Sequence, residues 1–191
     1  MSNLKTVLQN ARACTICKEN LPFAPNPILR ANVKARILLI GQAPGLKVNS
    51  SGVPWQDVSG DRLREWMGID SDMFYNEEKI AIIPMGFCYP GKGKSGDLPP
   101  RPECAPEWHP KLLSLLPNIQ LTILIGQYAQ ERYLQTNRKE TLSATVQAFK
   151  KYNPYFPIVH PSPRNQIWLK KNPWFLKELV PYLRKQVARI L

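Results

Sequence analysis

The sequence has no long apolar run, few cysteines and few acidic residues, and each shortage excludes a class of protein. No stretch of about 18 consecutive apolar residues occurs, so a membrane-spanning helix is not expected. Residues 1–10 lack a basic segment followed by an apolar one, so a secretory signal peptide is not expected either. These absences predict a cytoplasmic protein with no membrane partner. In that reducing compartment the 4 cysteines are expected to be free thiols or metal ligands, not disulfides.

Acidic residues are scarce relative to basic ones. The chain has 14 Asp and Glu against 26 Lys and Arg, a formal net charge of +12. Such an excess favours a polyanionic partner, with nucleic acid first and a membrane surface second. The alternative is a basic soluble protein without such a partner.

The pattern of apolar residues predicts an α/β fold. A length of 191 residues suits a single domain spanning 1–191. Short aliphatic runs alternate with amphipathic segments, which indicates a parallel sheet with helices on both faces. The expected strands are 36–40, 79–85, 121–125 and 156–159. The expected helices are a first one capped by Ser2 and ending near residue 12, then 60–68, 107–116, 127–135 and 172–190.

One turn stands out as a candidate binding loop. The buried run Ile37–Ile40 leads directly into Gly41-Gln42-Ala43-Pro44-Gly45. This turn follows the carboxyl end of its strand, where open α/β sheets bind ligands. The glycines allow close approach of the backbone, and the proline stiffens the loop. A structural turn without function is the alternative, since many α/β proteins have a glycine-rich turn here.

The cysteines form two pairs with the spacing of a metal centre. Cys14 and Cys17 are separated by two residues, and Cys88 and Cys104 by fifteen. Four thiolates suit either zinc or an iron–sulfur cluster. The wide, proline-rich second pair favours a [4Fe-4S] cluster over zinc, and zinc remains the alternative metal. Four unrelated buried cysteines are the third possibility.

A third motif, His160-Pro161-Ser162, follows the last expected strand. In this order, the glycine-rich turn, the cysteine framework and the histidine turn resemble the uracil-DNA glycosylase superfamily, most closely its iron–sulfur branch. The resemblance extends from about Cys14 to the C-terminal helix. It implies a three-layer α/β/α fold around a mainly parallel four-stranded sheet. It also implies a DNA N-glycosylase that flips a damaged base out of the helix and hydrolyses its N-glycosidic bond.

The resemblance also implies roles for particular residues. His160 would donate a hydrogen bond to the base carbonyl as negative charge develops on the leaving base. Trp55 lies where that branch has a stacking phenylalanine. The implied base pocket comprises Gly41, Gln42, Ala43, Pro44, Gly45, Trp55, Pro84 and Met85. The implied DNA contacts are Ser162 on phosphate and Pro163, Arg164 and Asn165, with Ile167 and Trp168 behind, in the gap left by the flipped nucleotide. Lys47 and Arg101 fall in loops expected beside the site and are further candidates for phosphate contact.

The catalytic positions depart from the family pattern. Gln42 replaces the usual glutamate of the iron–sulfur branch, and Ala43 replaces the water-activating aspartate of the uracil-specific branch. Pro84 stands where an asparagine reads uracil, and Gly45 where a tyrosine excludes thymine. Asp57, two residues after Trp55, is the best replacement acid for orienting water, although a helix cap or turn residue is the alternative. Gln42 would position water more weakly through its amide.

Two functions therefore remain open. The first is excision of uracil or a related deaminated base. The second is binding of damaged or single-stranded DNA without excision, by a protein that has lost the acid and the asparagine. Nothing in the sequence indicates a protein partner or more than a monomer.

Overall fold

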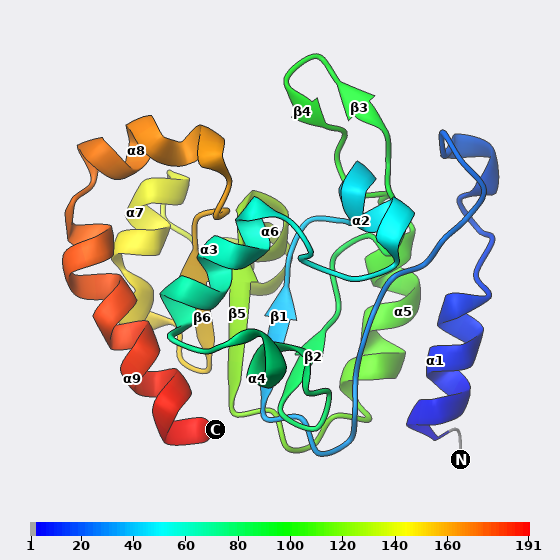
Figure 1. The fold of residues 1–191 in the computed structure, drawn as a ribbon, viewed down its shortest axis with the longest axis horizontal. Helices are drawn as coiled ribbons and strands as arrows, with labels where there is room; N and C mark the ends of the chain where they lie inside the picture. The colour runs from blue at the N-terminus through cyan, green and yellow to red at the C-terminus, as the bar shows by residue number, and fades with distance from the viewer. Residues whose placement is uncertain (1–2) are drawn as a thin grey trace.

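The computed structural model describes residues 3–191, and a four-stranded parallel sheet lies at its centre (Figure 1). The strands are β1 (Ile37–Ile40), β2 (Ile80–Ile82), β5 (Leu121–Ile125) and β6 (Tyr155–Ile158), in the order β2-β1-β5-β6. All three pairings are parallel, with Ile37 opposite both Ile80 and Leu121. The predicted sheet is confirmed, and it is parallel throughout.

Alternate residues of β1 enter two different cores. Ile37 and Leu39 face one core, and Leu38 and Ile40 face the other. The first core is covered by α3 (Val58–Met67), α4 (Ser71–Tyr75), α7 (Leu142–Gln147) and α9 (Val180–Ile190). The second is covered by α1 (Leu4–Arg12), α5 (Cys104–Leu113) and α6 (Gln127–Leu134). A strand buried on both faces explains why the sequence shows an unbroken aliphatic run, and the three-layer α/β/α prediction is confirmed.

Several short elements differ from the sequence prediction. Asn3, not Ser2, caps α1, because its side chain accepts a hydrogen bond from the Thr6 amide at 2.9 Å; Ser2 lies outside the described residues. Three helices fall in segments where none was predicted: α2 (Leu46–Ser51), α4 and α8 (Gln166–Lys171). The helix α7 lies in a segment that gave no clear signal. Helices this short are marginal alone and depend on tertiary packing, so local sequence gives little sign of them.

The long loop predicted before Cys104 also contains regular structure. It holds an antiparallel hairpin formed by β3 (Lys92–Gly93) and β4 (Gly96–Asp97), and each strand is two residues long. The last helix begins with a π-helical turn, η5 (Phe175–Leu179), before α9. The 3-10 turns are η1 (Lys18–Asn20), η2 (Gln135–Asn137), η3 (Phe149–Lys151) and η4 (Pro163–Asn165). Among the described residues, no helix has the length and hydropathy needed to cross a membrane.

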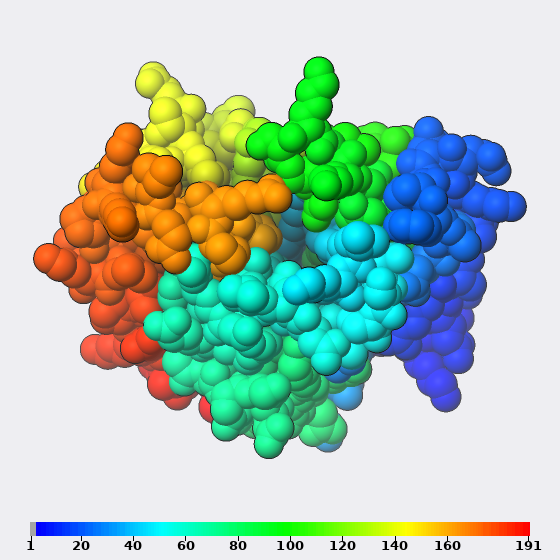
Figure 2. Space-filling view, turned by 45° about the horizontal axis from the view of Figure 1, so that its top comes forward, coloured from blue at the N-terminus to red at the C-terminus, as the bar shows by residue number. Residues whose placement is uncertain are grey.

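The carboxyl ends of all four strands meet at one edge of the molecule. The chain crosses from β2 on one side of β1 to β5 on the other, and such a switch in strand order opens a crevice between the diverging loops. Figure 2 shows this edge hollowed between the orange, green and cyan segments of the chain. The sheet topology therefore places a cavity beside the loop that follows β1.

The buried sheet predicts a stability effect. Leu39 is fully buried at the centre of β1, and Leu39→Ala removes packed methyl groups and leaves a cavity. We expect a loss of about 2–5 kcal/mol in the free energy of unfolding, measured by urea denaturation. Leu176→Ala is the control, because that side chain is 47% exposed. Equal effects of the two substitutions would contradict the assigned core.

Candidate active site

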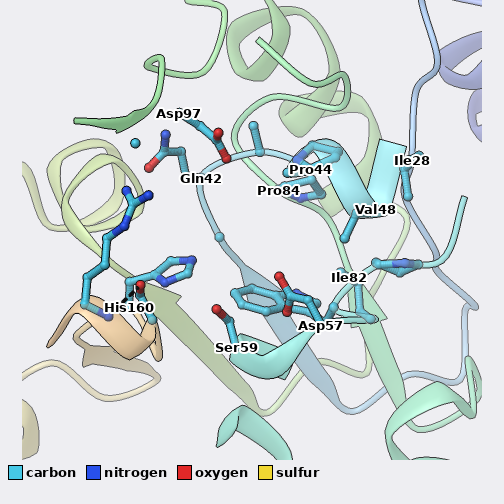
Figure 3. A pocket seen from close by; sticks show the side chains of 18 of the residues that line it. Ile28, Gln42, Pro44, Val48, Asp57, Ser59, Ile82, Pro84, Asp97 and His160 are labelled. Atoms are coloured by element: carbon cyan, nitrogen blue, oxygen red, sulfur yellow. Dashed lines mark hydrogen bonds between the residues drawn. The ribbon is translucent and has the colours of Figure 1, made fainter. Parts of the chain in front are cut away.

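A cavity of about 490 Å³ lies at the carboxyl edge of the sheet (Figure 3). Predicted residues from four separate segments meet on its walls. They are Gly41, Gln42, Ala43, Pro44, Gly45, Trp55, Asp57, Pro84, His160, Ser162, Pro163 and Arg164. The structure thus brings the glycine-rich turn, the Trp55 segment and the histidine turn into one site.

Trp55 has a strained backbone that its neighbours hold in place. Its φ angle is +59°, in the left-handed region that bulky residues rarely adopt. A Cβ on Gly60 would lie 1.7 Å from the Trp55 carbonyl oxygen, and one on Gly41 would lie 2.9 Å from the indole ring. The Arg64 guanidinium donates a hydrogen bond to the same carbonyl at 3.3 Å. Two glycines and one arginine therefore fix the indole against the wall of the cavity.

His160 lies beside this indole, at the end of β6. The two ring centroids are 5.5 Å apart and tilted by 32°. The Asn165 side-chain amide donates to the His160 carbonyl oxygen at 2.7 Å, which holds the turn closed. Burial lowers the pKa of the His160 ring, and the negative charge of Asp57 opposes that change only in part. The imidazole is therefore neutral near pH 7, with one N–H available as a donor.

The Asp57 side chain both caps a helix and lines the cavity. Its Oδ1 accepts a hydrogen bond from the Gly60 amide at 2.9 Å, so it is the N-cap of α3. Its side chain also lines the cavity, as Figure 3 shows. The cap that the sequence offered as the alternative is present. Because the cap uses one carboxylate oxygen, the other remains available to the cavity.

Gln42 connects the first turn to the hairpin. Its side-chain Nε2 donates to the Leu98 carbonyl oxygen at 2.8 Å. One N–H of the amide is therefore engaged in holding the segment after β4, and the second N–H and the amide oxygen are left to face a ligand.

Four residues predicted for the base pocket and the DNA contacts lie outside the cavity, and one of them, Asn165, closes the histidine turn instead. Met85, in the loop after β2, is buried and packs into the core that is covered by α5. Arg101 forms an ion pair with Glu103 at 2.6 Å beside the cysteines, so it does not lie with the other predicted phosphate contacts. Lys47 is exposed on α2.

The two residues expected behind the histidine turn, Ile167 and Trp168, lie in different environments. Trp168 turns inward and donates from its indole to the Ser143 hydroxyl at 2.8 Å, so it does not point into the space left by a flipped nucleotide. Ile167, next to it on α8, is 70% exposed. Of this pair, only Ile167 presents an apolar side chain to solvent.

Other residues of the site were missed in the sequence. The hairpin adds Ser95, Gly96 and Asp97 to the cavity wall, and the remaining additions are Ile28, Val48, Pro54, Ser59 and Ile82. The turn residues Ser95-Gly96 were a signal for a hairpin, but nothing local indicates that it folds over the site. Arg62 was also missed, and it donates to the Ser162 carbonyl oxygen at 3.0 Å.

The four cysteines surround a second, smaller cavity. Cys14 and Cys17 follow α1, Cys88 follows β2, and Cys104 begins α5, and their neighbours on the wall are Leu21, Pro25, Pro27, Gly86, Phe87 and Arg101. All four are free thiols. Within residues 3–191, no three Cys, His, Asp or Glu side chains lie close enough to hold a single metal ion. The four cysteines therefore line one cavity, as predicted, but their sulfur atoms are not close enough together to hold one metal ion.

The electrostatics of this cavity suit a cationic group. Burial, with smaller contributions from charge repulsion among the cysteines, raises the pKa of Cys88 to about 11 and of Cys104 to about 12. Thiolates in this setting need a compensating positive charge, which a metal group supplies. Four sulfur donors around one mostly apolar cavity therefore fit an iron–sulfur cluster by their chemistry.

Comparison with known proteins gives two findings. A family model described as the uracil DNA glycosylase superfamily matches residues 30–184. The type-4 uracil-DNA glycosylase of Saccharolobus solfataricus is 26% identical over 171 residues, which cover 85% of this chain and 77% of that relative. Both matches include the glycine-rich turn, the hairpin and the histidine turn.

The close contact at Gly60 predicts an unusual response to alanine. In most helices Gly→Ala is stabilising by up to about 1 kcal/mol. Gly60→Ala should instead destabilise the protein by about 1–3 kcal/mol, because the new methyl group meets the Trp55 carbonyl. Thermal or urea unfolding measures the change. Gly45→Ala is the control, since its Cβ would meet only the Asp97 carboxylate at an ordinary 3.5 Å; a stabilised Gly60 variant would contradict the described contact.

Proposed function

Because the chain belongs to the uracil-DNA glycosylase superfamily, we propose that it is a DNA N-glycosylase that removes uracil or a related deaminated base in base-excision repair. The observation that carries the proposal is the convergence of Trp55, Asp57 and His160 on one cavity with the glycine-rich turn. A volume of about 490 Å³ has room for a nucleobase and its sugar. A base within a duplex cannot reach such a cavity, so the nucleotide would be flipped out.

The residues divide the reaction between them. The neutral His160 ring donates its N–H to a carbonyl of the base, where negative charge develops as the N-glycosidic bond breaks. The free oxygen of Asp57 orients a water molecule and stabilises positive charge on the sugar. Water adds to C1′, and the base leaves with the bonding electrons and takes up a proton. The sugar keeps the new hydroxyl group, so the step is a hydrolysis.

Stacking and charge would hold the DNA. The Trp55 indole offers a flat surface for the flipped base, since every base has a π face. The Ser162 hydroxyl donates to a phosphate, while the amides of Arg164 and Asn165 donate to Ser162 itself and are not free. The Arg164 side chain on the cavity wall and Lys47 on α2 add positive charge. With a formal charge of +12, the chain attracts the DNA backbone over a longer range. We propose that it acts as a single-domain monomer.

The cysteine cavity is proposed to bind a structural [4Fe-4S] cluster. The four thiols lie on α1, the loop after β2, and α5, so a cluster would join segments that are distant in sequence. Four thiolates suit a cluster or a zinc ion, and the wide, proline-rich pair Cys88 and Cys104 favours the cluster. When bound, the group supplies structural support, and excision requires no redox step.

A second function has a specific observation in its favour. The carboxylate proposed for catalysis is already a helix cap, and Ala43 and Pro84 remove the family's acid and its base-reading asparagine. A protein that binds damaged DNA without cutting would show the same cavity. The experiment must therefore measure binding and excision together.

The assay uses labelled oligonucleotides that contain uracil, hypoxanthine or xanthine, in single strands and duplexes, with alkali cleavage of the abasic product. We expect wild-type excision and a loss of about 100-fold or more in Asp57→Asn. Asparagine caps a helix as well as aspartate does, so this variant removes the charge and keeps the cap. Asp72→Asn, on exposed α4, is the control. Tight binding with no excision would support the second function, and an active Asp57→Asn would remove Asp57 from the mechanism.

The cluster has its own prediction. Protein purified without oxygen should show broad visible absorbance and contain about four irons and labile sulfide per chain. Cys88→Ser should lose the iron and the absorbance, and Ile16→Ser, 56% exposed in the same region, should keep both. A colourless protein with one zinc per chain would contradict the cluster.

A further inference from the structure

The β3–β4 hairpin brings a carboxylate into the cavity that the mechanism above does not use. Asp97, the last residue of β4, lines the cavity beside Gln42 and lies across it from Asp57 (Figure 3). Its Oδ2 would be 3.5 Å from a Cβ on Gly45, so it contacts the glycine-rich turn. The side chain is open to the solvent in the cavity and therefore accessible to an entering ligand.

Three contacts fix the position of this carboxylate. Gln42 binds the Leu98 carbonyl oxygen at 2.8 Å, directly after Asp97. The Leu98 amide donates to the Gly91 carbonyl oxygen at 2.8 Å, which closes the base of the hairpin. On the other side, the Arg164 guanidinium packs against Gly96, where a Cβ would lie only 2.7 Å from its Nη1. The hairpin is thus joined to both the glycine-rich turn and the histidine turn.

The charges around Asp97 leave it able to accept hydrogen bonds. Arg164 stabilises the ionised form, Asp57 opposes it, and the Tyr89 hydroxyl also interacts with the carboxylate. Burial and Asp57 raise the pKa of Asp97 above its usual value. An ionised carboxylate only accepts hydrogen bonds, so Asp97 would bind a ligand group that carries an N–H.

We propose that Asp97 recognises the ring N–H of the flipped base, in place of the side-chain amide that Pro84 cannot supply. This inference rests on the proposed function. Deamination changes a ring nitrogen from an acceptor in cytosine and adenine to an N–H donor in uracil and hypoxanthine. A carboxylate attracts the N–H and repels the lone pair of the unmodified base. Thymine and guanine also carry this N–H, so Asp97 excludes only cytosine and adenine.

The test measures recognition separately from excision. Oligonucleotides carry a 2′-fluoroarabino nucleotide, whose fluorine opposes cleavage, with uracil or cytosine as the base. Fluorescence anisotropy gives the ratio of the two dissociation constants. Wild type should prefer uracil by about 10- to 100-fold, the range expected for a hydrogen bond to a charged group. A variant that loses a negative charge binds both oligonucleotides more tightly, and the ratio of their dissociation constants removes this general effect.

Two variants give different expected results. Asp97→Ala should lower the preference for uracil to within about twofold, because the acceptor is lost. Asp97→Asn should bind the cytosine oligonucleotide more tightly than Asp97→Ala does, because both variants lose the charge and only the rotated amide donates to the cytosine ring nitrogen. A purely structural role for Asp97 would not produce that gain. Asp72→Asn has the same chemical change on exposed α4 and should keep the wild-type ratio.

The outcomes separate this inference from the proposed function. If both Asp97 variants keep the wild-type ratio, the inference is wrong, whether or not the protein excises uracil. If the ratio depends on Asp97 and unmodified uracil is bound but never excised, Asp97 recognises the base and the proposed glycosylase activity is wrong. Urea unfolding of each variant checks that the substitution of Asp97 in the exposed hairpin leaves the fold intact.

Discussion

The backbone conformation of Trp55 is the constraint on which the rest of the site depends. A left-handed conformation is costly for a tryptophan and persists only where the surroundings determine it fully. Here Gly60 leaves room for the Trp55 carbonyl and Gly41 leaves room for the indole. The same turn places Asp57 at the start of α3. One strained residue therefore sets the floor of the cavity, the helix cap and the position of the candidate acid.

Electrostatics give the cavity two different sides. One side holds the neutral His160 ring, the Trp55 indole and the Asp57 carboxylate. The other side holds Asp97 and Arg164, which offset one another. A strongly basic protein thus has a cavity lined by two carboxylates and one guanidinium. In the proposed function, the overall positive charge attracts the DNA backbone and single hydrogen bonds in the cavity distinguish the base, so that affinity and specificity arise from different residues.

Much of the fold and part of the site could be predicted from the sequence. Buried strands such as Ile37–Ile40 are recognisable because both faces are apolar, and their carboxyl ends locate the cavity. The meeting of Trp55, Asp57 and His160 followed from the family resemblance. Asp97 could not be predicted, because its place depends on long-range contacts from Gln42 and Arg164 to the hairpin. Arg101 lies apart from the cavity for a local reason, since its side chain pairs with Glu103 two residues later.

The two arginines of α3 have a mechanical consequence. Arg62 holds the histidine turn through the Ser162 carbonyl, and Arg64 holds the Trp55 segment through its carbonyl. Both walls are thereby tied to one helix and move as a single body, with few independent degrees of freedom. The hairpin has a different character, since its strands are two residues long and its tip is exposed. Segments with few buried contacts open at the lowest free-energy cost, so opening of the cavity would begin by breaking the contacts that Gln42 and Arg164 make with the hairpin, with the two walls tied to α3 left in place.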